Sequence, residues 1–118
     1  MLTSKVLTRV SLSVPGFHAW KSAPDAVGFL RDRHRHMFGI TVEFAGDLNR
    51  GVEFFIGRQA IEEALIVAYH RDGLGFDFGY SSCEMIGVTL AAIVDSRFKV
   101  AAVEVSEDGE NSGRVEFV

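Results

Sequence analysis

Three histidines in the first third of the chain have the spacing of a metal site. His34 and His36 are separated by one residue, so in a β-strand both side chains point to the same face. His18 belongs to an earlier segment that a neighbouring strand can bring alongside them. Three imidazole nitrogens with one open coordination position are what a catalytic zinc ion requires. The sequence therefore offers His18, His34 and His36 as candidate zinc ligands.

Arginines interleave with these histidines and suggest a second interpretation. Arg31, Arg33 and Arg35 form a local basic cluster, which is typical of a solvated surface or of a site for a small anion. In that case the histidines are structural and bind no metal. The formal net charge of −4 argues against binding to a nucleic-acid polymer, which needs an excess of Lys and Arg.

Length and composition indicate one folded domain spanning residues 1–118. The chain is 47% hydrophobic and 24% charged, as expected for a globular protein. The lone cysteine, Cys83, has no internal disulfide partner, which favours a reducing compartment. The first residues lack the apolar stretch of a signal peptide, and no apolar run is long enough to span a membrane. We therefore expect a soluble cytoplasmic protein without a membrane partner.

Apolar and polar residues alternate in several segments, as in half-buried strands. The expected strands are residues 6–14, 38–44, 52–56 and 99–106, with 115–118 as a short edge strand. Pro15-Gly16 is expected to end the first strand. The turn at residues 46–51 would join the second and third strands as an antiparallel hairpin.

Helical periodicity is present over residues 57–69 and 82–94, and residues 24–30 suggest a short helix. Ser81-Ser82-Cys83-Glu84 has the pattern of a capping box, with Glu84 at the third helical position. The loop at residues 70–80 contains Phe78, which is either a packing residue or a stacking surface for a flat ligand. Together these elements predict an α+β fold: an antiparallel four-stranded sheet with two main helices on one face.

Five motifs, in order along nearly the whole chain, resemble the tunnelling fold of 6-pyruvoyl- and 6-carboxy-tetrahydropterin synthases. They are Phe17-His18, His34-Arg35-His36-Met37-Phe38, Gly51-Val52-Glu53-Phe54-Phe55, Ser81-Ser82-Cys83-Glu84 and Val103-Glu104-Val105-Ser106-Glu107. The resemblance implies that His18, His34 and His36 hold zinc and that Glu107 anchors a pterin ring. It also implies a ring-shaped homo-oligomer, a hexamer or a tetramer.

The chain departs from this family where the chemistry is done. Residues 25–33 contain no cysteine, although the family has its nucleophile a few residues before the histidine pair. Tyr69-His70 replaces the family's Asp-His pair. Each missing acid–base group costs roughly 10²–10⁴-fold in rate, so we expect no synthase activity.

The resemblance therefore implies binding without catalysis. The chain is also similar to small phage-encoded proteins, through the stretch from Leu30 to Phe38 and the Glu107 to Asn111 tail motif. By analogy of fold, it would suit a phage anti-defence sponge that sequesters cyclic nucleotide or ADP-ribose-derived immune signals in the host cytoplasm. The ligand is expected to be a small nucleotide- or pterin-like molecule bound between subunits. The expected ligand-binding residues are Glu107, Glu84, Ser82, Cys83, Arg31, Arg33, Arg35, Arg114 and Phe78, with the arginines on phosphates. Two alternatives remain: a zinc-dependent pterin synthase or lyase, and a purely structural assembly protein.

Overall fold

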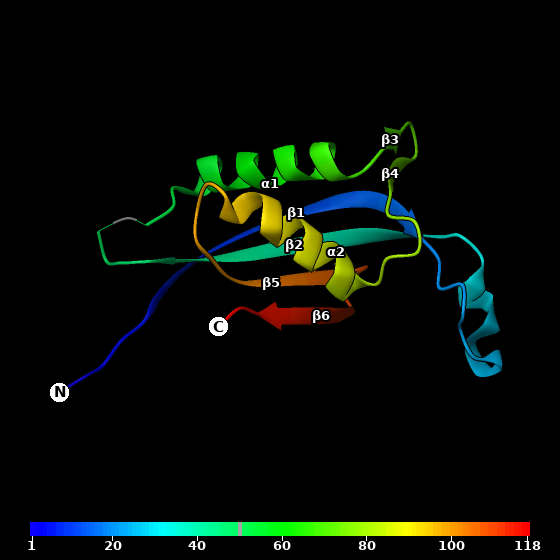
Figure 1. The fold of residues 1–118 in the computed structure, drawn as a ribbon, viewed down its shortest axis with the longest axis horizontal. Coiled ribbons are helices and arrows are strands. Elements are labelled where there is room, and N and C mark those ends of the chain that lie inside the picture. The colour runs from blue at the N-terminus through cyan, green and yellow to red at the C-terminus, as the bar shows by residue number, and fades with distance from the viewer. Residues whose placement is uncertain (50) are drawn as a thin grey trace.

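A six-stranded sheet runs through the molecule, and its two long helices lie on one face (Figure 1). The computed structural model describes residues 1–49 and 51–118. The strand order is β3-β4-β1-β2-β5-β6. The strands are β1 (Val6–His18), β2 (His34–Gly46), β3 (Arg71–Asp72), β4 (Gly75–Asp77), β5 (Val100–Glu107) and β6 (Asn111–Glu116). Neighbouring strands run antiparallel except β1 and β4, which are parallel.

The helices are α1 (Phe54–Ala68), α2 (Cys83–Asp95) and a short 3₁₀-helix, η1 (Asp25–Arg31). The core lies between the sheet and the two long helices. Alternate residues of β2 point into it, and Phe38, Ile40, Val42 and Phe44 are fully shielded from solvent. Ile61 and Leu65 of α1 and Ile86 and Leu90 of α2 pack onto these side chains. The expected α+β class, with helices on one face, is confirmed.

The sheet has six strands and not the four that were predicted, and the strand predicted at residues 52–56 is wrong. Residues 52–56 do not form a strand, because Glu53 caps α1: its carboxylate accepts hydrogen bonds from the backbone N–H groups of Phe55 and Ile56. The expected hairpin partner of β2 is therefore the first turn of a helix. The two extra strands, β3 and β4, are only two and three residues long and lie inside the expected 70–80 loop.

The first strand is longer than expected, and this has consequences for function. Pro15-Gly16 does not end β1, which continues in register with β2 until His18 lies opposite His34. Gly16 allows this continuation because a Cβ at that position would meet the rings of Phe78 and Phe38 at 2.5 and 3.0 Å. The last strand covers Asn111–Glu116 rather than 115–118 and pairs with β5 from Ala102 to Glu107.

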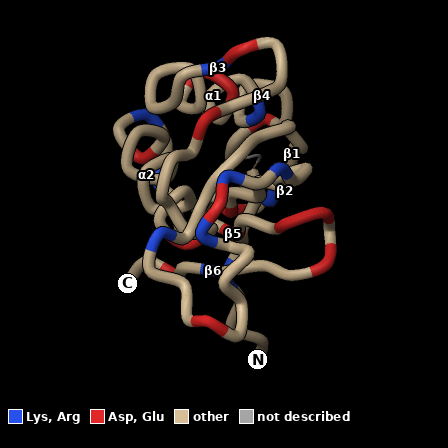
Figure 2. The backbone as a smooth tube through the Cα atoms, turned by 90° about the vertical axis from the view of Figure 1, so that its right-hand side faces the viewer, with Lys and Arg blue, Asp and Glu red and all other residues tan. Residues whose placement is uncertain are grey.

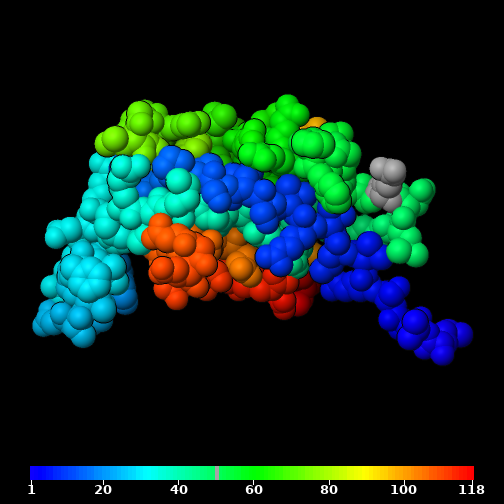
Figure 3. Space-filling view, turned by 180° about the vertical axis from the view of Figure 1, so that it is seen from behind, coloured from blue at the N-terminus to red at the C-terminus, as the bar shows by residue number. Residues whose placement is uncertain are grey.

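The other face of the sheet is not covered by a helix, and Figure 3 views the molecule from that side. It is polar: Ser11 and Thr41 share a hydrogen bond of 2.8 Å, and Arg114 forms an ion pair with Glu43. Residues 20–33, drawn in cyan, form a lobe that stands away from the sheet. Among the described residues, none of the helices is long and apolar enough to cross a membrane.

Candidate metal centre and adjoining pocket

Four potential metal ligands converge where three strands end. His18 is the last residue of β1, His34 and His36 begin β2, and Glu107 is the last residue of β5. One ligand atom from each lies within 4.8 Å of the other three. Two ligands of a single zinc ion stand at most about 4.2 Å apart, twice the metal–nitrogen distance, so the four atoms are close to bonding range. The prediction that the three histidines lie together is confirmed.

A buried phenylalanine, Phe38, packs against two of the three histidine rings. Phe38 is fully shielded, and its ring centre lies 5.1 Å from that of His18 and 5.6 Å from that of His36, edge to face in both cases. Phe38 is also the β2 residue paired with Glu107. The same rigid ladder therefore sets the positions of all the candidate ligands.

Each imidazole is oriented through its Nδ1 atom. His18 Nδ1 lies 2.9 Å from the carbonyl oxygen of Ser81, and His34 Nδ1 lies 2.8 Å from that of Asp32. His36 Nδ1 lies 2.7 Å from a carboxylate oxygen of Asp108. Hydrogen bonds from His36 and from the Met37 N–H lower the pKa of Asp108, so this carboxylate is ionised and can only accept.

These three contacts determine what the other ring nitrogens can do. Because all three partners are acceptors, each Nδ1 carries the proton, and in a neutral ring Nε2 then presents a lone pair. Metal-binding histidines show this pattern, in which the second nitrogen donates to a carbonyl or carboxylate.

The contacts at Nε2 favour a bound cation. Glu107 Oε2 lies 2.9 Å from His18 Nε2 and 2.8 Å from His36 Nε2. Between neutral imidazoles and a carboxylate, these are contacts between acceptors. His36 Nε2 is also shielded from water, and its contact with Glu107 lacks hydrogen-bond geometry, which leaves it without a hydrogen-bond partner. A cation among these atoms would satisfy all of them, so the residues present fit a zinc ion.

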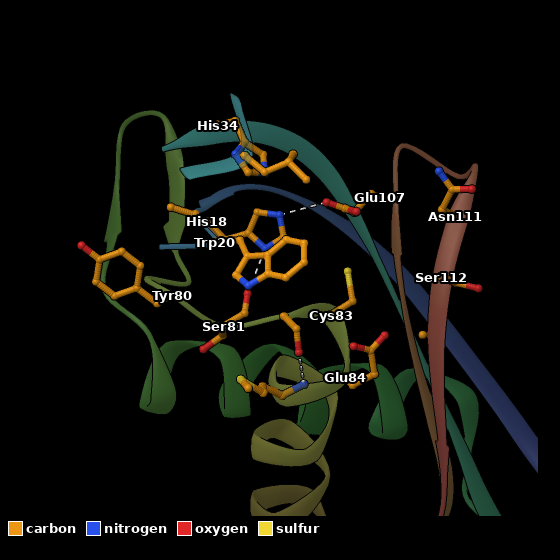
Figure 4. A pocket seen from close by; sticks show the side chains of 15 residues that line it. His18, Trp20, His34, Tyr80, Ser81, Cys83, Glu84, Glu107, Asn111 and Ser112 are labelled. Carbon is orange, nitrogen blue, oxygen red and sulfur yellow. Dashed lines mark hydrogen bonds and ion pairs between the residues drawn. The ribbon is translucent and has the colours of Figure 1, made fainter. Parts of the chain in front are cut away.

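A pocket of about 480 Å³ opens beside the histidines (Figure 4). It lies between the ends of β1 and β5, the start of α2 and the beginning of β6. Trp20 and Tyr80 contribute aromatic surface, and Glu84, Glu107 and Asn111 contribute polar groups. His18 and His34 are also among its lining residues, so the metal centre and the pocket are contiguous.

The one cysteine lines this pocket but is a poor nucleophile. Burial, followed by the negative charges of Glu107 and Glu84, raises the pKa of Cys83 to about 12. A thiol with that pKa stays protonated at neutral pH. Ser82 is also occupied, because its hydroxyl accepts the Met85 N–H at 3.2 Å as the N-cap of α2.

Glu84 does not have the capping role that the sequence pattern suggested. The cap is Ser82, which places Glu84 at the second helical position rather than the third. Its carboxylate lies against Gly113 of β6, in the space that a side chain at that position would fill. Of the two roles that the sequence allowed for Glu84, cap or ligand-binding residue, its position at the pocket is compatible with the second.

The remaining expected ligand contacts lie outside the pocket of their own chain. Phe78 is 2% exposed and stacks within the core. Arg31 donates to Asp25 and to the Ala23 carbonyl oxygen, and Arg33 lies over the ring of Phe17 at 4.1 Å. Arg35 lies 6.0 Å from the Phe17 ring, and Arg114 is engaged on the uncovered sheet face.

No lysine or arginine is among the described residues that line the pocket. Figure 2, a view of the end of the molecule that carries the lobe, shows acidic and basic residues interspersed along the backbone. None of the four arginines expected to contact phosphates therefore lines the pocket of its own chain.

Sequence reasoning missed several residues that the structure brings to the site. Asp108 belongs to the Glu107 to Asn111 motif but was assigned no role of its own, although it orients His36 and has a positive φ of 57°. The available signal was its position: Asp108 directly follows Glu107, an expected ligand-binding residue, at the end of a strand. Trp20, Tyr80 and Asn111 carried no pattern that placed them in a pocket.

Comparison with solved structures shows the fold. The chain resembles 6-pyruvoyl tetrahydropterin synthase from Caenorhabditis elegans, with a TM-score of 0.69 and 13% identity over 98% of this chain and 97% of that one. It also resembles an uncharacterized protein from Wolinella succinogenes, with a TM-score of 0.68 and 15% identity over 98% and 100% of the two chains. A catalytic-residue mutant of 6-pyruvoyltetrahydropterin synthase from Plasmodium vivax matches with a TM-score of 0.64 and 14% identity over 98% and 99%.

Neither a family model nor a curated protein matches the sequence. The chain thus has the fold of the 6-pyruvoyl tetrahydropterin synthases, and the resemblance inferred from its motifs is confirmed at the level of the fold.

Proposed function

We propose that this protein binds the flat ring of a purine- or pterin-like small molecule in the pocket beside the histidines, without transforming it. The observation that carries the proposal is the composition of the pocket: aromatic surface, acidic hydrogen-bond acceptors, and a cysteine whose raised pKa keeps it protonated. Such a site retains the means to hold a ring but lacks a nucleophile.

Glu84 is the main recognition group in this proposal. Its carboxylate lies at the pocket edge against Gly113 and can accept two N–H groups from a heterocycle. Glu107 faces the same space but is already in contact with His18 and His36. Trp20 and Tyr80 are 49% and 68% exposed, so a ligand that stacked on them would remove apolar surface from water.

A homo-oligomer is part of the proposal and is supported by the unpaired sheet edges. The pairing of β4 with β1 covers only Gly16 and Phe17, so the rest of β1 pairs with β2 alone. β6 forms the opposite edge of the sheet. Edges of this kind favour strand pairing with further copies, which would also bring arginines from a neighbour near the pocket.

Calorimetry with a panel of ligands tests the binding. Guanosine, a reduced pterin, cyclic nucleotides and ADP-ribose would each be titrated into the wild type and into Glu84→Gln. We expect at least one compound to bind and the variant to weaken it by at least about tenfold, because Gln keeps only one acceptor oxygen and turns an NH₂ donor toward the N–H groups of the heterocycle. Glu110→Gln, in the exposed turn between β5 and β6, is the matched control. If none of the compounds binds, or if Glu84→Gln binds as the wild type does, the proposal is wrong.

The cluster of His18, His34 and His36 is one reason to test an alternative function, that of a zinc-dependent pterin synthase or lyase. Zinc bound there would supply Lewis-acid polarisation of a substrate carbonyl. Incubating the zinc-loaded protein with a pterin substrate, followed by chromatography, separates the two ideas. Turnover would rule out a purely binding role.

A further inference from the structure

Glu107 places a carboxylate oxygen among the candidate ligand atoms themselves and not beside them. One of its oxygens, Oε2, lies within 2.9 Å of Nε2 on two of the three imidazoles. The same oxygen belongs to the set of four potential ligand atoms that lie within 4.8 Å of one another. Glu107 therefore stands within the ring of ligand atoms, on the side where the pocket opens.

We propose that Glu107 is the fourth metal ligand, so that the chain itself closes the coordination shell of the ion. Catalytic zinc sites keep three protein ligands and leave the fourth position for water or substrate, whereas structural sites fill all four with protein atoms. A three-histidine, one-carboxylate set belongs to the second kind. The proposal concerns only the metal and does not depend on which ligand fills the pocket.

Neighbouring carboxylates are excluded from this role by their contacts. Asp108 faces the outer side of His36, where its two oxygens accept the Met37 N–H and the His36 Nδ1–H. Glu84 lies against Gly113, across the pocket. Glu107 alone among these three shares the space between the Nε2 atoms, and its side chain is only 28% exposed.

A closed site gives the ion a mechanical role. It would join the ends of β1, β2 and β5 at one point, where the ladder hydrogen bonds stop. The two ends of β1 and β2 at this point lead into the lobe of residues 20–33, so the ion would also anchor the base of that lobe. A saturated ion would not be available to polarise a ligand, which fits a pocket that binds without catalysis.

Cobalt(II) substitution tests the proposal, because the visible spectrum of Co²⁺ reports coordination number and ligand exchange. The chelated wild type would be titrated with Co²⁺ and then with azide, a small anion that occupies open coordination positions. We expect stoichiometric binding with an intense four-coordinate spectrum that azide does not change. We expect Glu107→Gln to lose at least about tenfold in Zn²⁺ affinity, the lower bound for losing even an outer-sphere partner, and to respond to azide.

Glu110→Gln is the matched control, because it removes a carboxylate charge from the exposed turn that follows Glu107, outside the ligand set. It should keep the affinity and spectrum of the wild type. The proposal is overturned if the wild-type spectrum shifts with azide, if Glu107→Gln binds Zn²⁺ as tightly as the wild type, or if the wild type binds neither ion. Should Glu107→Gln fail to fold, the azide titration of the wild type decides the question.

Discussion

Asp108 gives the sharpest test of how the histidines are oriented. Its carboxylate holds the proton of His36 on Nδ1, at 2.7 Å, and so leaves Nε2 free to bind a cation. In Asp108→Asn, the amide can donate to Nδ1 and favour the tautomer whose Nε2 carries the proton. Loss of such an outer-sphere partner typically lowers metal affinity about 10–100-fold. At 1.36 kcal/mol per tenfold change, this corresponds to about 1.4–2.7 kcal/mol of binding free energy.

Backbone strain must be separated from this effect. Asp108 has a φ of 57°, which asparagine and glycine tolerate but most other residues do not. Asp108→Asn and Asp108→Gly therefore both keep the turn while removing the carboxylate. The measurement is competition for Zn²⁺ against a chromogenic chelator.

A suitable control for Asp108 is Asp72→Gly. Asp72 accepts the Leu74 N–H at 2.7 Å in a turn on the far edge of the sheet and should leave metal affinity unchanged. If both Asp108 variants bind Zn²⁺ as the wild type does, then Asp108 does not orient a ligand and the tautomer assignment of His36 is wrong.

Two further predictions concern ligand binding at Gly113 and the stability of the sheet at Glu43. Gly113→Ala places a methyl group where the Glu84 carboxylate lies, so it should weaken ligand binding in calorimetry while leaving Zn²⁺ affinity unchanged; an unaltered ligand affinity would exclude Glu84 from the site. Glu43→Gln should lower the free energy of unfolding by about 1.5–3 kcal/mol in urea at pH 7, because hydrogen bonds to Arg114 hold the pKa of Glu43 below its usual value. A lowered folded-state pKa gives stability that is present above about pH 4.3 and is lost as the pH falls through the folded value, so the difference between wild type and variant should shrink in acid. A constant difference between pH 7 and pH 3 would contradict this account.

The sequence predicted the parts of the fold that depend on regular periodicity. Alternation in β2 and the helical stripe of α2 were sufficient to identify the core, since Phe38, Ile40, Ile86 and Leu90 are all fully shielded. The start of α1 was not identified, because Phe54, Phe55 and Ile56 are apolar and resemble a strand until Glu53 is recognised as a cap. All three are exposed in the structure, so their hydrophobicity carried no information about burial.

The candidate site was predictable only where strand register determines it. The i, i+2 spacing placed His34 and His36 on one face, and the register of β1 against β2 added His18. The contact between Glu107 and the histidines depends on the pairing of β5 with β2, which joins residues about 70 positions apart and leaves no local pattern. The resemblance to the pterin synthases supplied Glu107 as a ligand-binding residue, but its place among the candidate metal ligands follows from the three-dimensional arrangement.

The negative charge of the pocket indicates which ligands it can bind, whereas the fold alone does not. In the metal-free protein, a phosphate group placed beside Glu84 and Glu107 would face two carboxylates, and none of the described residues that line the pocket carries a guanidinium or an ammonium group. Like charges in a partly enclosed site disfavour binding. One isolated chain should therefore bind nucleosides and uncharged pterins more tightly than their phosphorylated forms. This preference should reverse only in an assembly in which arginines of a neighbouring copy reach the pocket. If the protein forms a ring, the ratio of the affinities for phosphorylated and unphosphorylated ligands should therefore change with protein concentration.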